Sequence, residues 1–378
     1  MPRHLWLRAA LVLVVVAGSL WYLYPPARAI NLGLDLQGGI HLVLGVEAEK
    51  YVAAQTDRAA EEFKAALDRK GIPVRRVTRT GESAFTVELA SPQAWNDALT
   101  VAGEFTVFTV RDRDDAAGRF TLAMTDRQVS TLRDDAVRQG LETIRNRVDQ
   151  FGVAEPTITR QGTDRILIQL PGVQDPERAK ALIGKTALLE FKLVDDRVSP
   201  EAALQGQLPE GAEVVYQRRI DKETKVEAKV PYVVQKRAVL TGAELTRAEV
   251  QADPNAPGNW QVAIEFTPTG TRIFGEVTEQ NVGRQLAIIL DGTLYSAPRI
   301  NERIPGGRAV ITGQFTVEEA RDLAIVLRAG ALPAPVRILE ERTVGPSLGA
   351  DSIRQGMLAI AASAALVFVF MLVYYRLS

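Results

Sequence analysis

The sequence predicts an α+β fold held between two transmembrane helices. An uncharged apolar block lies near each end of the chain, and the stretch between the blocks alternates helix-like and strand-like apolar patterns. A β-α-β-β-α-β order can be traced twice through that stretch. With 378 residues, the chain is long enough for two or three domains.

The first apolar block, residues 9–24, is predicted to be transmembrane helix 1. Counted with its apolar neighbours it reaches the length of a membrane span, Trp21 lies where interfacial aromatic residues are common, and residues 1–8 before it are basic. A cleaved signal peptide is the alternative, because Ala27-Arg28-Ala29 has the form of a cleavage site.

The second block, residues 357–375, is predicted to be transmembrane helix 2, because it carries no charge where a core helix would show a polar face. Arg376 follows it, so the positive-inside rule puts residues 1–8 and 376–378 in the cytoplasm. The body between the spans is then expected on the outer side of the membrane. Because the chain ends two residues after Arg376, we expect a truncated chain.

The composition removes several classes of function. The 45 Lys and Arg residues balance 46 Asp and Glu residues, so no general basic field draws nucleic acid to the chain. The absence of cysteine excludes disulfides, thiolate nucleophiles, iron–sulfur clusters and cysteine zinc sites. With His4 and His41 as the sole histidines, neither a hydrolase triad nor a histidine metal site is expected. We therefore predict no enzyme activity, no catalytic or metal-binding residue and no cofactor.

The first β-α-β-β-α-β unit contains a long helix with one apolar face, from Val129 to Phe151, and a short helix capped by Asp175. This order is ferredoxin-like. Its strands are predicted at residues 40–46, 157–160, 165–170 and 188–194.

A second unit repeats the order. Strand Trp260–Phe266 precedes a helix at Thr269–Asn281, and Asp291-Gly292 joins two short strands in a hairpin. Thr316 opens a capping box for the next helix, and Pro335–Thr343 is the last strand. The two units can share one sheet, as a duplicated ferredoxin-like base. That base is predicted to comprise residues 31–46, 128–196 and 260–341.

Two stretches are predicted to be insertions into this base. Residues 47–127 have the pattern of an extra α+β subdomain. Residues 197–259 are more polar and are interrupted by proline, with a hairpin expected around Asp221-Lys222, and we interpret them as a mobile head. An ordinary surface insertion remains the alternative for the head.

The sharpest local motif is Gly-Leu-Asp-Leu-Gln-Gly-Gly, directly after the first span. It lacks the spacing and the lysine of a phosphate-binding loop. One interpretation is structural, because glycine permits a bent start to a strand. The other is a stiff membrane junction that passes movement from helix 1 to the base. The residues of this candidate junction are Gly33, Asp35, Gln37, Gly38 and Gly39.

Charged residues elsewhere receive structural interpretations. Arg145, Arg147 and Asp149 belong to the long helix of the first unit and are interpreted as its solvated face. Glu318 and Glu319 follow Thr316 and are explained by helix capping and the helix dipole.

The glycine motif and the motifs that follow it resemble the SecD/SecF family of protein translocase subunits, which belongs to the RND superfamily. Each piece alone is weak, but the ordered set between two spans is specific. The later motifs are Ile144–Pro156, Arg165–Gly172, Leu240–Gly242, Phe266–Pro268, Leu290–Gly292, Val326–Pro333 and Val344–Gly349.

The resemblance implies a SecD-type subunit of the long form, with six membrane spans in the full family pattern and a place in the bacterial inner membrane. Its implied partners are SecF, the SecYEG translocon, YajC, membrane lipid and an unfolded preprotein, and no nucleic acid. The family's proton-conducting charges lie in later spans, which this chain does not include, so no proton-relay residue can be named.

The resemblance also implies a ferredoxin-like periplasmic base and a movable head. With SecF, such a subunit uses the proton gradient to complete translocation and release of preproteins on the periplasmic side. The substrate contact is then expected within the head, between Arg197 and Asn259. The alternative function is the periplasmic portion of an RND-type drug or lipid exporter.

Overall fold

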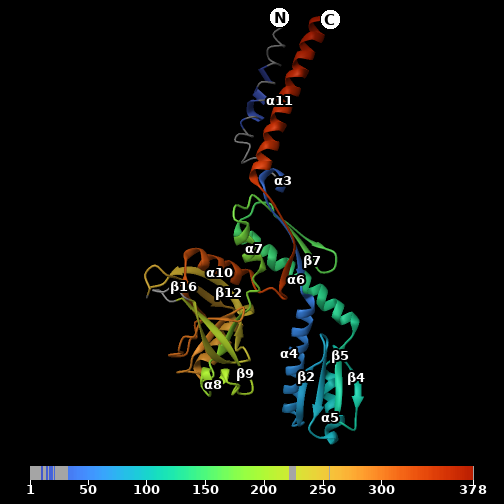
Figure 1. Ribbon diagram of the computed structural model, residues 1–378, viewed down its shortest axis with the longest axis vertical. Helices are drawn as coiled ribbons and strands as arrows, with labels where there is room; N and C mark the ends of the chain where they lie inside the picture. The colour runs from blue at the N-terminus through green and yellow to red at the C-terminus, as the bar shows by residue number, and fades with distance from the viewer. Residues whose placement is uncertain are drawn as a thin grey trace.

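The computed structural model describes residues 33–220, 227–254 and 256–377, together with residues 10, 11, 14, 15, 17–19 and 21. Helix α11 (Pro346–Leu377) projects as a stalk from a folded body, which divides into two lobes at its far end (Figure 1). Half of the predicted first span, and the turn predicted at Asp221-Lys222, lie outside the described residues.

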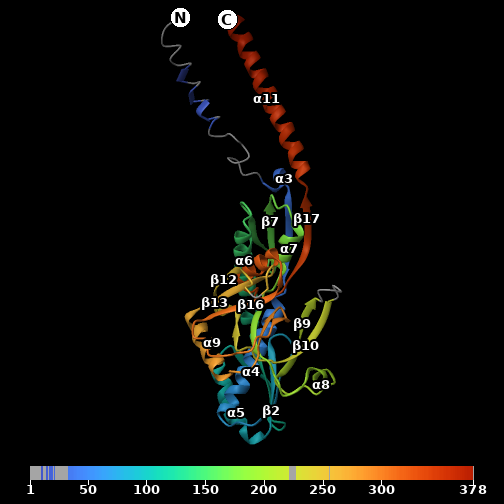
Figure 2. The ribbon, with the colours of Figure 1, turned by 90° about the vertical axis from the view of Figure 1, so that its left-hand side faces the viewer.

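The sheet nearest α11 has four strands in the order β17-β1-β7-β6, and each neighbouring pair is antiparallel (Figures 1 and 2). In chain order this is the arrangement 4-1-3-2 of one βαββαβ unit. The alternating apolar residues of β1 face α6 and α7, with which they form one core. We call this part the base. Its elements are β1 (Gly39–Val46), α6 (Asp126–Phe151), β6 (Thr157–Gln161), β7 (Arg165–Pro171), α7 (Pro176–Gly184) and β17 (Val336–Val344).

The fourth strand of the base differs from the one predicted. The strand expected at 188–194 exists as β8 (Leu189–Leu193), but it pairs with β14 and β11 in another sheet. Phe191 of β8 packs against Phe266 and Phe274, so burial of this ring draws β8 away from the base. β17 occupies the edge of β1 that β8 was expected to fill.

A second part, residues 189–329, contains a six-stranded sheet in the order β10-β9-β15-β14-β8-β11 and a three-stranded sheet in the order β12-β13-β16. One core joins the two sheets with α9 and α10. We call this part the head lobe. Its further elements are α8 (Pro200–Leu204), β9 (Ala212–Ile220), β10 (Glu227–Gln235), β11 (Leu240–Thr241), η2 (Gly242–Glu244), β12 (Leu245–Ala252), β13 (Trp260–Phe266), α9 (Pro268–Gln280), β14 (Leu286–Leu290), β15 (Thr293–Ser296), β16 (Arg308–Phe315) and α10 (Val317–Ala329).

The head lobe does not divide where the sequence predicted. Strands from the expected head, 197–259, pair with strands expected in the base: β9 with β15, and β12 with β13. The expected second unit is not one sheet either, because β13 and the β14–β15 hairpin lie in different sheets and β17 belongs to the base. The prediction that two βαββαβ units share one sheet is therefore wrong. The polar, proline-interrupted sequence forms the edge strands β10, β11 and β12 and the strand β9 beside β10, and these strands pair with partners from elsewhere in the chain.

Residues 48–124 form a third part, at the position of the predicted extra α+β subdomain. Its sheet has the order β2-β3-β5-β4, and the rings of Phe63, Phe85 and Phe120 meet in a separate core. Helix α4 begins directly after β1, and α6 begins directly after β5, so two paired helices connect this subdomain to the base. Its elements are α4 (Ala48–Arg69), β2 (Val74–Arg79), β3 (Ala84–Leu89), η1 (Pro92–Ala94), α5 (Trp95–Glu104), β4 (Phe108–Asp114) and β5 (Arg119–Met124).

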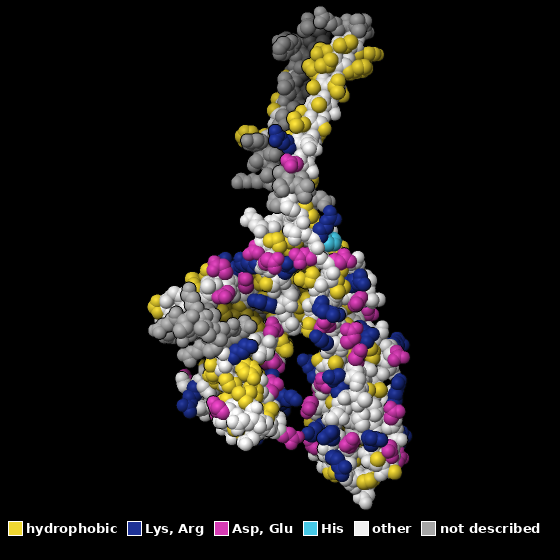
Figure 3. Space-filling model, viewed as in Figure 1, with side chains coloured by type: hydrophobic (Ala, Val, Ile, Leu, Met, Phe, Trp, Pro, Cys, Tyr) yellow, Lys and Arg dark blue, Asp and Glu magenta, His cyan; other side chains and the backbone are white. Residues whose placement is uncertain are grey.

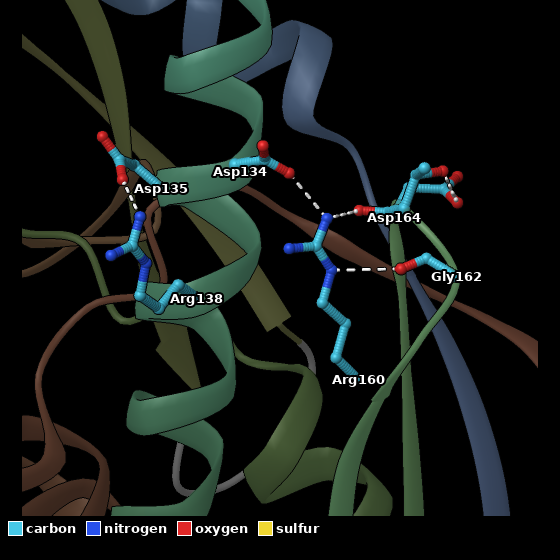
Figure 4. Close-up of polar contacts among 7 residues, drawn as sticks. Asp134, Asp135, Arg138, Arg160, Gly162 and Asp164 are labelled. Atoms are coloured by element: carbon cyan, nitrogen blue, oxygen red, sulfur yellow. Dashed lines mark hydrogen bonds and ion pairs between the residues drawn. The ribbon is translucent and has the colours of Figure 1, made fainter.

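Arg160 fixes the β6–β7 hairpin to α6 (Figure 4). Its guanidinium donates to Asp134 at 2.6 Å and to the carbonyl of Gly162 at 3.1 Å. The neighbouring pair of Arg138 and Asp135, 2.5 Å apart, stays within the helix. An exposed ion pair adds little stability by itself, but Arg160 also holds the turn in position. The hairpin and α6 are therefore expected to move as one piece.

Candidate functional site

The glycine motif forms one helical turn and then a sharp entry into β1. The amides of Leu36 and Gln37 both donate to the carbonyl of Gly33 at 3.0 Å, which closes α3 (Leu34–Gln37), the turn that contains Asp35. Gly38 and Gly39 follow with φ values of 72° and 134°, which L side chains rarely adopt. The backbone therefore has the bent strand start expected from the sequence.

Gly39 is also the point where two strands approach closely. A Cβ atom on Gly39 would lie 2.1 Å from the carbonyl oxygen of Leu170, whereas a Cβ on Gly33 would meet nothing within 4 Å. The carbonyl of Gly38 accepts a hydrogen bond from the amide of Gly172 at 2.9 Å. The start of β1 is thus fixed against the end of β7, with no room for a side chain between them.

The glycine motif lies at the corner of the base from which α11 leaves (Figures 1 and 2). Helix α3 contacts α11. Gly39 pairs with Val344, the last residue of β17, and α11 begins at Pro346. β17 therefore links the start of α11 to β1 by direct strand pairing.

A cavity of about 470 Å³ opens beside this corner, lined in part by Gln37 and Gly172. Arg178 of α7, on its wall, donates to the carboxylate of Asp322 in α10, with a shortest distance of 2.6 Å. This hydrogen bond raises the pKa of Arg178. The guanidinium also lies 5.7 Å from the centre of the Phe151 ring. Arg178 thus connects the base to the head lobe.

Arg147 is buried, so the prediction that it lies on a solvated helix face is wrong. Arg145 and Asp149 are exposed, but Arg147 is 1% exposed. Burial lowers its pKa to about 10, while Asp291 opposes that change. Its guanidinium donates to backbone carbonyls at the end of α7 and after α10, where helix carbonyls lack partners within the helix. The acceptors are Leu182, Ile183, Lys185, Thr186 and Gly330.

The described residues hold no group of three or more His, Cys, Asp or Glu side chains that could bind a metal ion. His41 of β1 is hydrogen-bonded to Gln169 of β7, with 3.1 Å between Nδ1 and Nε2. This contact joins neighbouring strands of the base.

Comparison with known proteins gives matches along most of the chain. The SecD/SecF GG motif matches residues 26–49, the N-terminal part of the SecDF P1 domain matches 137–196, and the SecDF P1 head subdomain matches 212–334. Protein translocase subunit SecD of Syntrophobacter fumaroxidans is 45% identical over 98% of this chain and 72% of its own length. The chain belongs to the SecD family. Membership gives it a role in protein export.

Further SecD-family proteins are similar to this chain in sequence and in structure. SecD of Calditerrivibrio nitroreducens is 44% identical over 99% of this chain and 73% of its own length. A crystal structure of SecDF in the super-membrane-facing form superposes with a TM-score of 0.51 at 28% identity, covering 96% of this chain. The chain spans 38% of that SecDF protein. The α+β arrangement therefore resembles that of SecDF over nearly the whole chain.

The family models also bear on the two regions that the sequence singled out. The GG motif model includes Gly33 to Gly39, the candidate junction. The head model runs from β9 past α10, which follows the head lobe and not the narrower segment 197–259. Within that segment, Leu204 and Tyr216 are large apolar side chains with 54% and 41% exposure. Substrate contact there stays a prediction.

Proposed function

We propose that the chain is the front part of a SecD subunit that, with SecF, completes translocation and release of preproteins on the periplasmic side of the bacterial inner membrane. An unfolded polypeptide leaving the channel can slide in both directions. A lobe that grips it in one conformation and releases it in another biases the net movement. Membership of the SecD family, over nearly the whole chain, is the observation that carries this proposal.

The proposed energy source is the proton gradient. One unit charge crossing about 100 mV releases about 2.3 kcal/mol, enough to shift conformations that differ by a few kcal/mol. The proposed partners are SecF, the SecYEG translocon, YajC, membrane lipid and the preprotein. The role needs no covalent chemistry, so we propose no catalytic residue and no cofactor.

We propose a multi-pass inner-membrane location with the body in the periplasm. Among the described residues, one helix, Asp351–Tyr374, is long and apolar enough to cross a membrane. The motif Gly33–Gly39 would transmit movement of the membrane helices to the base. The contact of α3 with α11 and the pairing of Gly39 with Val344 support that junction role.

The proposal is tested by holding the head lobe still. Lys64 of α4 and Glu210 of the head lobe have charged atoms 4.0 Å apart, and both side chains are exposed. A Lys64→Cys/Glu210→Cys variant can be bridged by a short bis-maleimide, and the chain has no other cysteine to react. We expect a pulse-labelled secreted precursor to accumulate partly translocated in the source cell.

Each single-cysteine variant, treated with the same reagent, is the matched control and should export normally. Normal precursor release by the fully bridged protein would exclude a gripping movement of the head lobe.

A further inference from the structure

Strand β12 forms one edge of the three-stranded sheet in the head lobe. It pairs with β13 on one side, and no described strand pairs with its other side. Alternate backbone amide and carbonyl groups of an antiparallel edge strand point away from its partner. Such groups can bind an extended polypeptide as an added strand. The free edge of β12 is therefore a candidate binding surface.

A cavity of about 420 Å³ lies along this edge. Three consecutive residues of β12, Ala248–Val250, line it together with residues of α10 and with Gln150 at the end of α6. Consecutive side chains of a strand point to opposite faces of a sheet, so a cavity that all three residues line lies at the strand edge. No residue of β13 belongs to the lining, which places the cavity at the free edge.

The walls of this cavity are already packed. Helix α10 packs on α6 and on β12. Phe151 of α6 and Leu182 of α7 pack with the core of the head lobe, so the base supports the lobe beside the cavity. Ile325 of α10, which lines the cavity, is buried. A ligand that binds here would not have to order the walls first, which lowers the free-energy cost of binding.

Two arginines of α10 give the cavity a positive charge. Arg321 and Arg328 both line it, and because they are seven residues apart they lie on one face of the helix with about 10 Å between their Cα atoms. Both residues are exposed, and neither guanidinium has a hydrogen bond or ion pair with another described residue. Glu249, also in the lining, lies 3.7 Å from Arg247. Two guanidinium groups thus remain for an anionic ligand.

These features fit an acidic peptide in an extended conformation. Side chains at i and i+2 of a strand lie about 7 Å apart on one face, and two long arginine side chains on α10 can reach carboxylates at that spacing. Arginine binds carboxylates through two parallel hydrogen bonds. The strand edge would supply backbone partners for any sequence, and the guanidinium groups would select for negative charge.

A protective role is the competing interpretation, because charge near an edge strand also prevents aggregation. The edge strand β10 shows another form of protection, since Pro231 has no amide hydrogen to donate. Strand β12 contains no proline. Its two neighbouring cations belong to α10 and would repel basic peptides but attract acidic ones. The two interpretations therefore differ in whether an acidic peptide binds.

We propose that the free edge of β12, beside α10 and α6, binds acidic polypeptide segments by strand addition. The backbone of β12 pairs with the segment, and Arg321 and Arg328 bind its carboxylates. Strand β12 lies within residues 197–259, where the sequence predicts substrate contact. That the segment belongs to an exported polypeptide rests on the proposed function, but the binding itself does not.

The test uses the purified chain in detergent and a fluorescent peptide of alternating Glu and Thr residues, with binding measured by fluorescence anisotropy. Arg321→Ala/Arg328→Ala should weaken binding about tenfold, because charge-assisted hydrogen bonds are lost. Arg321→Glu/Arg328→Glu should instead bind a peptide of alternating Lys and Thr residues. Two N-methylated versions of the acidic peptide, modified at Glu or at Thr, should differ about tenfold in affinity, because the amides of one set alone face β12.

The matched control is another edge strand with two arginines. Strand β2 is an edge of the sheet in the extra subdomain, and its Arg75 and Arg76 are exposed. Arg75→Ala/Arg76→Ala removes the same charge from the chain and should leave the affinity for the acidic peptide unchanged. Inorganic phosphate at the concentration of the peptide should not displace it, because phosphate cannot pair with a strand edge.

Equal affinity of the acidic peptide for the unsubstituted chain and for Arg321→Ala/Arg328→Ala would overturn the site. Equal binding of the two methylated peptides, or displacement by equimolar phosphate, would overturn strand addition. These readouts need no export, so the site and the proposed function can fail separately. Peptide binding at β12 with normal precursor release by Arg321→Ala/Arg328→Ala would refute its use in export alone. Absent peptide binding with blocked release in the bridged protein would refute the site alone.

Discussion

Gly39 and Arg147 each join parts of the chain that are distant in sequence. Gly39 leaves no space for a larger residue, because the carbonyl of Leu170 occupies the place of a side chain. Arg147 carries a buried charge, and a buried guanidinium is tolerated only where polar groups replace its hydrating water. The carbonyls of α7 and Gly330 do so, and a lysine could not reproduce the planar set of donors that they need.

At the residue scale, Gly39→Ala should destabilise the chain by about 2–4 kcal/mol, because the change adds a steric clash to a strained φ. The measurement is the free energy of unfolding in urea. The same change should slow precursor release if Gly33 to Gly39 form the junction. Gly33→Ala is the matched control, since its Cβ would meet nothing within 4 Å, and it should behave like the unsubstituted chain. Unchanged stability and unchanged release for Gly39→Ala would remove the junction role.

At the element scale, the extra subdomain and the head lobe are attached to the base in different ways. Helices α4 and α6 follow β1 and β5 almost without a loop and pack on each other, so they join the extra subdomain firmly to the base. The chain enters and leaves the head lobe through the non-helical residues 185–188 and 330–335, and α10 of the head lobe packs on α6. The start of α10 shows how a cap fixes a helix end. The Thr316 side chain accepts from the amide of Glu319, and the Glu319 carboxylate accepts from the amide of Thr316, which confirms the predicted capping box.

Loss of this cap should be measurable. Thr316→Ala leaves the first turn of α10 without its side-chain acceptor and should cost about 1 kcal/mol in the free energy of unfolding. Thr100→Ala is a suitable control, because Thr100 is exposed and bonds back to Asn96 within α5. Equal losses for the two variants would show that the cap contributes nothing specific.

At the scale of the whole molecule, the three parts are coupled to different degrees. Figure 3 shows an opening between the head lobe and the extra subdomain, with acidic and basic side chains on both walls. Lys64 and Glu210 come within 4.0 Å of each other across this opening, and an exposed charged contact resists separation less than a packed apolar interface. The stalk is continuous with the base through β17, the extra subdomain is joined to the base by α4 and α6, and the head lobe contacts the base through α10 and α6.

The location of this body is testable with a single cysteine. Gln205→Cys should react with a membrane-impermeant maleimide in intact spheroplasts, because the body is expected in the periplasm. His4→Cys, in the predicted cytoplasmic segment, should react after lysis. Labelling of Gln205→Cys that also required lysis would place the body in the cytoplasm and contradict the export role.

Local patterns in the sequence determined the elements, because apolar periodicity, caps and turn residues act between near neighbours. The strands predicted for both units have nearly the observed bounds, and the cap at Thr316 and the bent start of β1 are observed. The C-terminal helix begins earlier than predicted, at Pro346, and strand β16 (Arg308–Phe315) was not predicted. The family resemblance was also readable from ordered motifs. Burial between distant segments decided the tertiary arrangement. The partner of β8, the edge filled by β17 and the interior position of Arg147 depend on contacts between distant segments, and no local pattern encodes which distant surface will cover a side chain.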